Sequence, residues 1–229
     1  MNLYFLVEGK RTERKVYPAW LAYLLPELKQ VKNYDEVEKN NYYLFSAEGY
    51  PSIIYEHLPN AIADVQDQGN YNYLVVCLDA DENTVGEIQN EIYEFISSEK
   101  IKLGNIELVI IVQNRCFETW FLGNRNIYSR QPQDRPLLDF VRYYDVSVNC
   151  PELMDKYPDF NTHAQFHAAY LKELFKAKNI NYSKKNPGDV LKPYYIEQLL
   201  KRIKDQNQHL PSFQTFIEFC NTIRLKISN

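Results

Sequence analysis

The sequence predicts an α/β fold, a mostly parallel sheet flanked by helices, with a helical C-terminal extension. Apolar runs at 2–7, 73–78 and 106–112 are typical of strands, and the continuous run at 73–78, YLVVCL, is typical of a strand buried on both faces. Helical periodicity separates these runs, and alternating strands and helices indicate a parallel sheet. After about residue 125 helical periodicity predominates.

Local signals support each element of the first half of the chain. Thr12 is placed to cap a helix, and Pro51 suits the first turn of another. Polar or acidic residues end each apolar run. In chain order we expect a strand at 2–7, a helix at 12–28, a strand at 42–46, a helix at 51–66, a strand at 73–78, a helix at 84–98, a strand at 106–112 and a helix at 116–122.

The second half of the chain is predicted to be mainly helical. The polar, proline-containing segment 131–135 predicts a loop, and NYSKKNPGD at 181–189 has turn chemistry. We expect helices at 161–177, 192–206 and 212–225. The chain therefore divides into an α/β domain, residues 1–124, and a helical, basic extension, residues 125–229.

The composition is that of a globular protein. Hydrophobic residues make up 45% and charged residues 24% of the 229 residues, which argues against disorder. No run of 18 apolar residues occurs, and the N-terminal run is too short for a signal peptide, so we expect no membrane segment and a cytoplasmic location. The four cysteines form no CxxC pair, which argues against a zinc ribbon or a disulfide framework and favours free thiols.

Charge is distributed unevenly along the chain. Residues 163–229 contain 11 Lys and Arg against 5 Asp and Glu, a net +6, whereas residues 1–162 carry a net −10. Such asymmetry indicates an anionic partner, and a solvated helical face is the alternative.

Carboxylates follow three of the predicted strands. Glu8 follows the first strand and Glu118 the fourth. Asp79 and Asp81 follow the third, and their spacing puts both carboxylates on one side of an extended segment. Ligands of parallel sheets bind beyond the carboxyl ends of the strands, and clustered carboxylates there suit Mg²⁺ or Mn²⁺. The alternatives are a polar turn at Glu8 and a solvated loop in which Asp81 or Asn83 caps the next helix.

Three sequence blocks, LVEGKRTE, VVCLDADEN and NRCFETWFL, together resemble a Toprim domain. The third block is similar to a stretch of RloB-like proteins, and YSKK at 182–185 resembles a later segment of theirs. Related Toprim nucleases occur in OLD-type phage-defence systems. The resemblance implies Mg²⁺- or Mn²⁺-dependent phosphodiester chemistry in which the metal ligands are Glu8, Asp79, Asp81 and Glu118. Glu13 is a further catalytic candidate, with a helix-dipole role as its alternative.

We therefore expect a divalent-metal-dependent nuclease that hydrolyses DNA or RNA, in defence against phage. Substrate phosphates would contact the basic residues Lys10, Arg115, Lys184 and Lys185, although the last two also suit a solvated loop. The expected partner is nucleic acid. An ATPase subunit and a second copy of the chain are left open, and no membrane partner is expected.

Two other functions are compatible with the sequence. The chain can be a catalytically silent Toprim-like partner that an ATPase regulates, or a haloacid-dehalogenase-like phosphatase, which also places Asp-x-Asp after a strand. A zinc pair at His163 and His167, four residues apart, lacks the HExxH pattern and an evident third ligand, so we expect an ordinary helix surface there.

Overall fold

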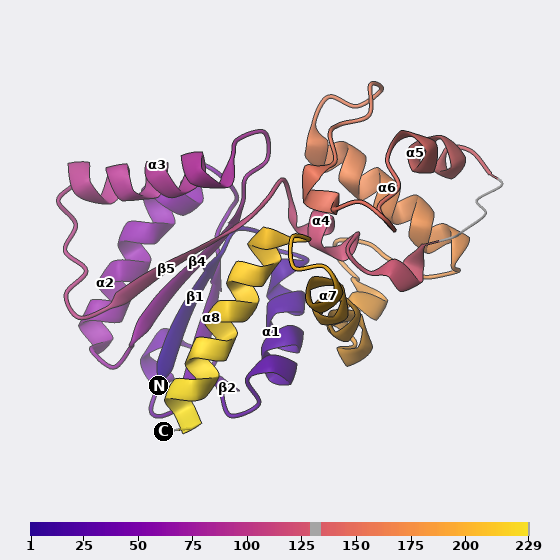
Figure 1. Ribbon diagram of the computed structural model, residues 1–229. Coiled ribbons are helices and arrows are strands. Elements are labelled where there is room, and N and C mark those ends of the chain that lie inside the picture. The colour runs from indigo at the N-terminus through magenta and orange to yellow at the C-terminus, as the bar shows by residue number, and fades with distance from the viewer. Residues whose placement is uncertain (129–133, 229) are drawn as a thin grey trace. The chain divides into compact units, whose positions relative to one another are not determined.

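The computed structural model describes residues 1–128 and 134–228 and confirms the α/β fold class (Figure 1). Its parallel sheet has the strand order β2-β3-β1-β4-β5. The strands are β1 (Asn2–Val7), β2 (Lys29–Gln30), β3 (Asn41–Ser46), β4 (Tyr73–Asp79) and β5 (Glu107–Gln113). The sequence does not predict β2, because two residues carry no periodicity. Of the predicted loop 131–135, residues 131–133 lie outside the described residues.

The chain forms two compact units. Unit 1 comprises Met1–Leu78, Val85–Val112 and Thr215–Asn229, and unit 2 comprises Asp79–Thr84 and Gln113–Gln214. These boundaries differ from the predicted division into 1–124 and 125–229. Most of the C-terminal helix belongs to unit 1, because its aromatic side chains pack on the sheet. The loop after β4 and the segment after β5 belong to unit 2.

The central strands β1 and β4 are buried as their apolar runs predict. On one face of the sheet, the Phe5 ring contacts Tyr17 of α1 (Glu13–Leu24) and Phe219 of α8 (Pro211–Ser228), at centroid distances of 6.2 and 6.4 Å. Figure 1 shows α8 running across the sheet beside α1. Helices with apolar stripes thus cover a strand pair that has few polar side chains.

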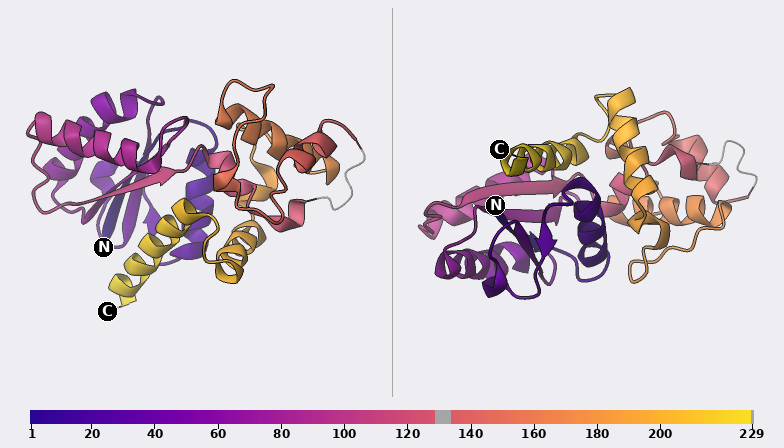
Figure 2. Two further views of the ribbon diagram at one scale, coloured as in Figure 1. Left: turned by 45° about the horizontal axis from the view of Figure 1, so that its top comes forward. Right: turned by 90° about the horizontal axis from the view of Figure 1, so that it is seen from below.

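Other helices cover the opposite face of the sheet in unit 1. The Tyr4 hydroxyl donates to Asp64 of α2 (Leu58–Gln68) at 3.1 Å. Phe95 of α3 (Val85–Ser98) packs edge-on against Tyr55, with centroids 5.1 Å apart. Figure 2 shows α2 and α8 on opposite sides of the sheet.

Two helices of unit 1 differ in detail from the prediction. Thr12 makes no capping side-chain hydrogen bond, and α1 ends at Leu24 rather than Leu28. The early end has a local cause, because Leu25 precedes Pro26 and a residue before proline avoids helical geometry. The helix predicted at 51–66 begins with a π-helical turn, Ile53–His57, before α2.

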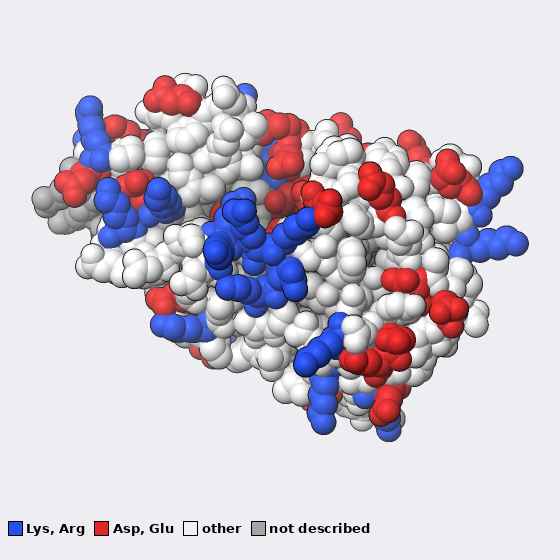
Figure 3. All heavy atoms as spheres, turned by 180° about the vertical axis from the view of Figure 1, so that it is seen from behind, with Lys and Arg blue, Asp and Glu red and all other residues white. Residues whose placement is uncertain are grey.

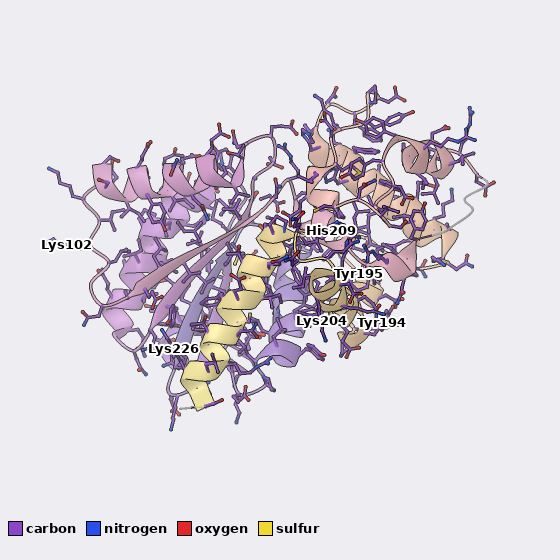
Figure 4. The ribbon with its side chains drawn as sticks, viewed as in Figure 1. Lys102, Tyr194, Tyr195, Lys204, His209 and Lys226 are labelled. Carbon is purple, nitrogen blue, oxygen red and sulfur yellow. The ribbon has the colours of Figure 1, made fainter. Side chains whose placement is uncertain are left out.

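Unit 2 is helical and rich in aromatic residues. Its helices are α4 (Phe117–Phe121), α5 (Leu137–Tyr143), α6 (His163–Ala177) and α7 (Pro193–Asp205). Phe166 of α6 lies at the centre of the ring cluster, 5.2 Å from Phe140 and 5.8 Å from Tyr170 between centroids. Figure 4 labels two successive tyrosines of α7. Tyr195 is buried and donates to the Phe121 carbonyl at 2.8 Å, whereas Tyr194 is 40% exposed.

Arg202 of α7 has the largest buried charged side chain among the described residues of unit 2, and it is 1% exposed. Its guanidinium donates to the carbonyl oxygens of Gly123, Val146 and Asn149 at 3.1, 2.8 and 2.6 Å. It also donates to Nδ1 of His209 at 3.1 and 3.0 Å. Arg202 therefore joins several segments of unit 2 and adds no charge to the surface.

Two sequence expectations concern the chain as a whole. The cysteines are free thiols, as predicted, and all four are buried: Cys77, Cys116, Cys150 and Cys220. Within the described ranges, none of the helices has the length and apolar character needed to span a membrane.

Candidate functional site

Glu118 is the central candidate of unit 2. It lies in the first turn of α4 and is 2% exposed, although the surrounding segment is apolar. The Tyr182 hydroxyl donates to its Oε1 at 3.0 Å, and the Lys184 ammonium lies 3.5 Å from the same oxygen. A buried carboxylate needs such partners because burial removes it from water. The loop that contains Lys184 thus pairs with a buried acid, rather than being purely solvated.

Hydrogen bonds join the loop after β4 to the segment after β5. The backbone N–H groups of Ala80 and Asp81 donate to the carbonyls of Gln113 and Arg115, at 2.9 and 2.8 Å. In return, the Arg115 guanidinium donates to the carbonyls of Asp81 and Asn83, both at 3.3 Å. Asp81 and Arg115 both have positive φ, 49° and 74°. These bonds hold Asp81 beside α4 and give Arg115 a role within the loop.

Electrostatic interactions link the acidic residues of unit 2. Desolvation raises the pKa of Asp81, the neighbouring Glu82 carboxylate raises it further, and the Lys184 ammonium lowers it. Burial raises the pKa of the Cys116 thiol, and the carboxylates of Glu118 and Asp79 add to that effect. Asp79 and Glu118 therefore both act on Cys116, while Asp81 and Glu118 share Lys184. Three of the four predicted metal ligands, Asp79, Asp81 and Glu118, therefore belong to unit 2.

The histidines of α6 are buried, so the prediction of an ordinary helix surface is wrong. His163 is 9% exposed and His167 is fully buried. Both ring nitrogens of His163 face carboxylates, Glu82 and Asp155, at 2.9 Å each. His167 bonds to the Thr119 hydroxyl at 2.8 Å, and burial lowers its pKa to about 4. The sequence held a signal for this, since both histidines continue the apolar stripe of α6.

A second buried acid, Glu152, supports the α4 segment, and the sequence gives no signal for it. Glu152 is 3% exposed and accepts from the Ser212 hydroxyl at 2.7 Å and the Ser212 N–H at 3.2 Å. The Ser212 hydroxyl in turn accepts from the Trp120 indole N–H at 2.7 Å and the Asn114 N–H at 3.1 Å. Burial raises the pKa of Glu152 to about 7, although its hydrogen bonds oppose the shift.

Glu8 and Lys10 follow β1 in unit 1. The Glu8 N–H donates to the Cys77 carbonyl of β4 at 3.0 Å, and its Oε1 accepts from the Tyr50 N–H at 3.2 Å. Lys10, a predicted phosphate contact, pairs with Glu48 on the surface. The structure defines each unit internally, so the convergence of Glu8 with the acids of unit 2 stays a prediction.

Glu13 is the first residue of α1, also in unit 1. Its carboxyl lies over Gly9, where an added Cβ would clash with the carboxyl oxygens. Burial raises the pKa of the Cys77 thiol, and the Glu13 carboxylate raises it further. Glu13 is thus directed toward β4, and the absence of a side chain at Gly9 permits this.

The basic residues after position 162 fall into both units. Arg224 and Lys226 belong to unit 1, and Arg224 donates to the Leu24 carbonyl. The others belong to unit 2, where Lys184 pairs with Glu118 and Lys185 is exposed. On the face that Figure 3 shows, one group of Lys and Arg side chains lies near the centre with Asp and Glu side chains at its upper edge, and the other charges of both signs are mixed. The charge asymmetry of the sequence therefore does not form a separate basic domain.

The donor types at this site fit a hard divalent cation, because Asp79, Asp81 and Glu118 all offer carboxylate oxygens. Across residues 1–128 and 134–228, however, no three His, Cys, Asp or Glu side chains are placed to hold a metal ion together. The donor chemistry supports a metal site, and the positions of the donors do not complete one.

Comparison of the chain with protein-family models, with curated proteins and with solved structures gives no match. The resemblance to Toprim and RloB-like proteins therefore stays a prediction from the quoted sequence blocks.

Proposed function

We propose that this chain is a divalent-metal-dependent nuclease of the cytoplasm. One observation carries the proposal: Glu118 is buried beside Tyr182 and Lys184 in the unit that also contains Asp79 and Asp81. A carboxylate in so apolar a segment is costly without a cation. Glu8 is the fourth expected ligand.

The charges around Asp81 support the same proposal. Desolvation and the Glu82 carboxylate both disfavour its ionised form, and the Lys184 ammonium favours it. A second cation would favour ionisation further, because opposite charges stabilise the charged form of a carboxyl group. The acids of unit 2 thus resemble ligands that repel one another in the absence of metal.

The proposed roles follow from these contacts. Asp79, Asp81 and Glu118 would hold the Mg²⁺ or Mn²⁺, which when bound supplies an activated water and neutralises charge on the phosphate. Lys184 lies beside Glu118 and would contact a substrate phosphate there. Arg115 would hold the Asp81 loop in position through the carbonyls that it already binds.

Cleavage assays with single- and double-stranded DNA and RNA over a Mn²⁺ titration test the proposal. We expect Mn²⁺-dependent cleavage by the wild type and none by the Asp79→Ala/Asp81→Ala variant. The Glu94→Ala/Glu99→Ala variant removes the same charge from exposed positions of unit 1 and should cleave normally. Absence of Mn²⁺-dependent cleavage by the wild type, or full cleavage by the Asp variant, would contradict the proposal.

A catalytically silent partner subunit is the second candidate. The Lys184–Glu118 pair favours it, because an ammonium already supplies positive charge where a metal would bind. A silent partner would bind nucleic acid without cleaving it at any Mn²⁺ concentration. The same assays, combined with a binding measurement, therefore separate the two candidates.

A further inference from the structure

Unit 2 contains a cavity of about 510 Å³ next to the end of α6. Its volume lies in the range of small-molecule sites, roughly 300–1,000 Å³. The walls come from the last turns of α6 and the segment that follows. They are formed by Lys172, Phe175, Lys176, Asn179, Ile180, Asn181 and Tyr182.

The charge of the cavity wall favours an anion. Lys172 and Lys176 are one turn apart on α6, so their side chains lie on the same face of the helix. Lys176 has an ion pair with Glu173 at 3.5 Å, yet it keeps 74% of its side-chain surface exposed. No Asp or Glu is among the described residues that line the cavity.

The rest of the wall suits a flat, partly apolar group. The half-buried Tyr182 ring packs on the buried Phe175 ring at 5.3 Å between centroids, so Tyr182 presents the aromatic surface of the wall, and Ile180 lines the cavity beside it. Asn179 and Asn181 add amide donors and acceptors. Aromatic rings beside cationic side chains are the combination that binds a base together with its phosphate.

Tyr182 connects the cavity with the acidic residues. Its ring lines the cavity, while its hydroxyl donates to Glu118 at 3.0 Å. A group bound in the cavity would therefore lie one side chain away from Glu118. We propose that the cavity binds one nucleoside phosphate, from either the end of a nucleic-acid strand or a free nucleotide. This inference rests on the proposed nuclease function and adds a binding site for one unit of its substrate.

Calorimetry on the full chain without metal tests the site. The probes are AMP and dAMP, adenosine, inorganic phosphate, and a 5′-phosphorylated tetranucleotide. We expect AMP or dAMP to bind more tightly than adenosine or phosphate alone, because only they use both the lysines and the Tyr182 ring. Tighter binding of the tetranucleotide than of the mononucleotide would identify a strand end as the source, and equal binding would identify a free nucleotide.

Matched charge reversals locate the site. Lys172→Glu/Lys176→Glu should weaken nucleotide binding by more than about tenfold, since it replaces two attractive charges by two repulsive ones. Lys201→Glu/Lys204→Glu makes the same change on exposed positions of α7, where Figure 4 labels Lys204, and should bind normally. Binding too weak to detect for every probe, binding of phosphate as tight as that of AMP, or equal loss in both variants would overturn the inference.

The Asp79→Ala/Asp81→Ala variant separates this inference from the proposed function. It should lose Mn²⁺-dependent cleavage and keep nucleotide binding, because neither residue lines the cavity. Cleavage by the wild type without nucleotide binding would refute the nucleotide site in the cavity and leave the proposed nuclease function standing. The opposite outcome is also informative. If the wild type cleaves no nucleic acid but binds nucleotide through Lys172 and Lys176, the nucleotide site is supported and the nuclease function is refuted.

Discussion

Replacing Glu152 with glutamine should change how the stability of this protein depends on pH. Glu152 is buried among donors from Ser212 and has a pKa of about 7, against an ordinary value of 4.5. Burial disfavours the carboxylate more than the hydrogen bonds favour it. The native state therefore keeps a proton at pH values where the unfolded chain has released it.

The sign and size of the effect follow from linkage. As the pH rises from about 4.5 to 7, the unfolded state binds fewer protons than the native state, so the free energy of unfolding falls. The stabilisation is fully present below about pH 4.5 and is lost as the pH passes through 7. The difference between pKa values of 4.5 and about 7, at about 1.4 kcal/mol for each pH unit, gives a total loss of about 3.5 kcal/mol, of which about 3 kcal/mol falls between pH 4.5 and 8.

Urea unfolding of the wild type and of Glu152→Gln over about pH 4.5–8 measures this loss. The wild-type stability relative to the variant should fall by about 3 kcal/mol across the range. Tryptophan fluorescence is a suitable signal, because the Trp120 indole bonds to the same Ser212 hydroxyl. Glu197→Gln, at an exposed position of α7, should give a nearly flat difference. A flat or rising difference for Glu152→Gln would refute the argument.

Further predictions test the metal site, the surface charge and the core of unit 2. Mn²⁺ should raise the melting temperature of the wild type but not of Asp79→Ala/Asp81→Ala, because a ligand of the native state opposes unfolding; an equal rise in both would exclude these ligands. Lys185→Ala should lower the log–log salt slope of nucleic-acid binding by up to about one unit, and an unchanged slope would leave Lys185 without a phosphate contact. Arg202→Met should lower the free energy of unfolding by about 3 kcal/mol and the melting temperature by about 6–12 °C, because buried carbonyl groups lose their hydrogen-bond donors. The control Lys201→Met should change the free energy of unfolding by no more than about 0.5 kcal/mol, and an equally small change for Arg202→Met would contradict this prediction.

The sequence by itself determined the α/β class and most of the elements, because those signals are local. A continuous apolar run such as 73–78 needs cover on both faces, and a helix must follow before the next parallel strand. Even the early end of α1 has a local cause at Pro26. The placement of Asp79 at the end of β4 and of Glu118 after β5 also follows from the order of elements along the chain.

Tertiary structure decided which side chains meet, and periodicity carries no information about that. The spacing of α6 already puts His163 on its apolar face, yet only the fold shows that the ring lies between the carboxylates of Glu82 and Asp155. The same holds for Lys184, which a turn segment presents as solvated and the fold pairs with Glu118. The physical reason is that partners distant in sequence set the burial and charge around a residue, and these two quantities determine its chemistry.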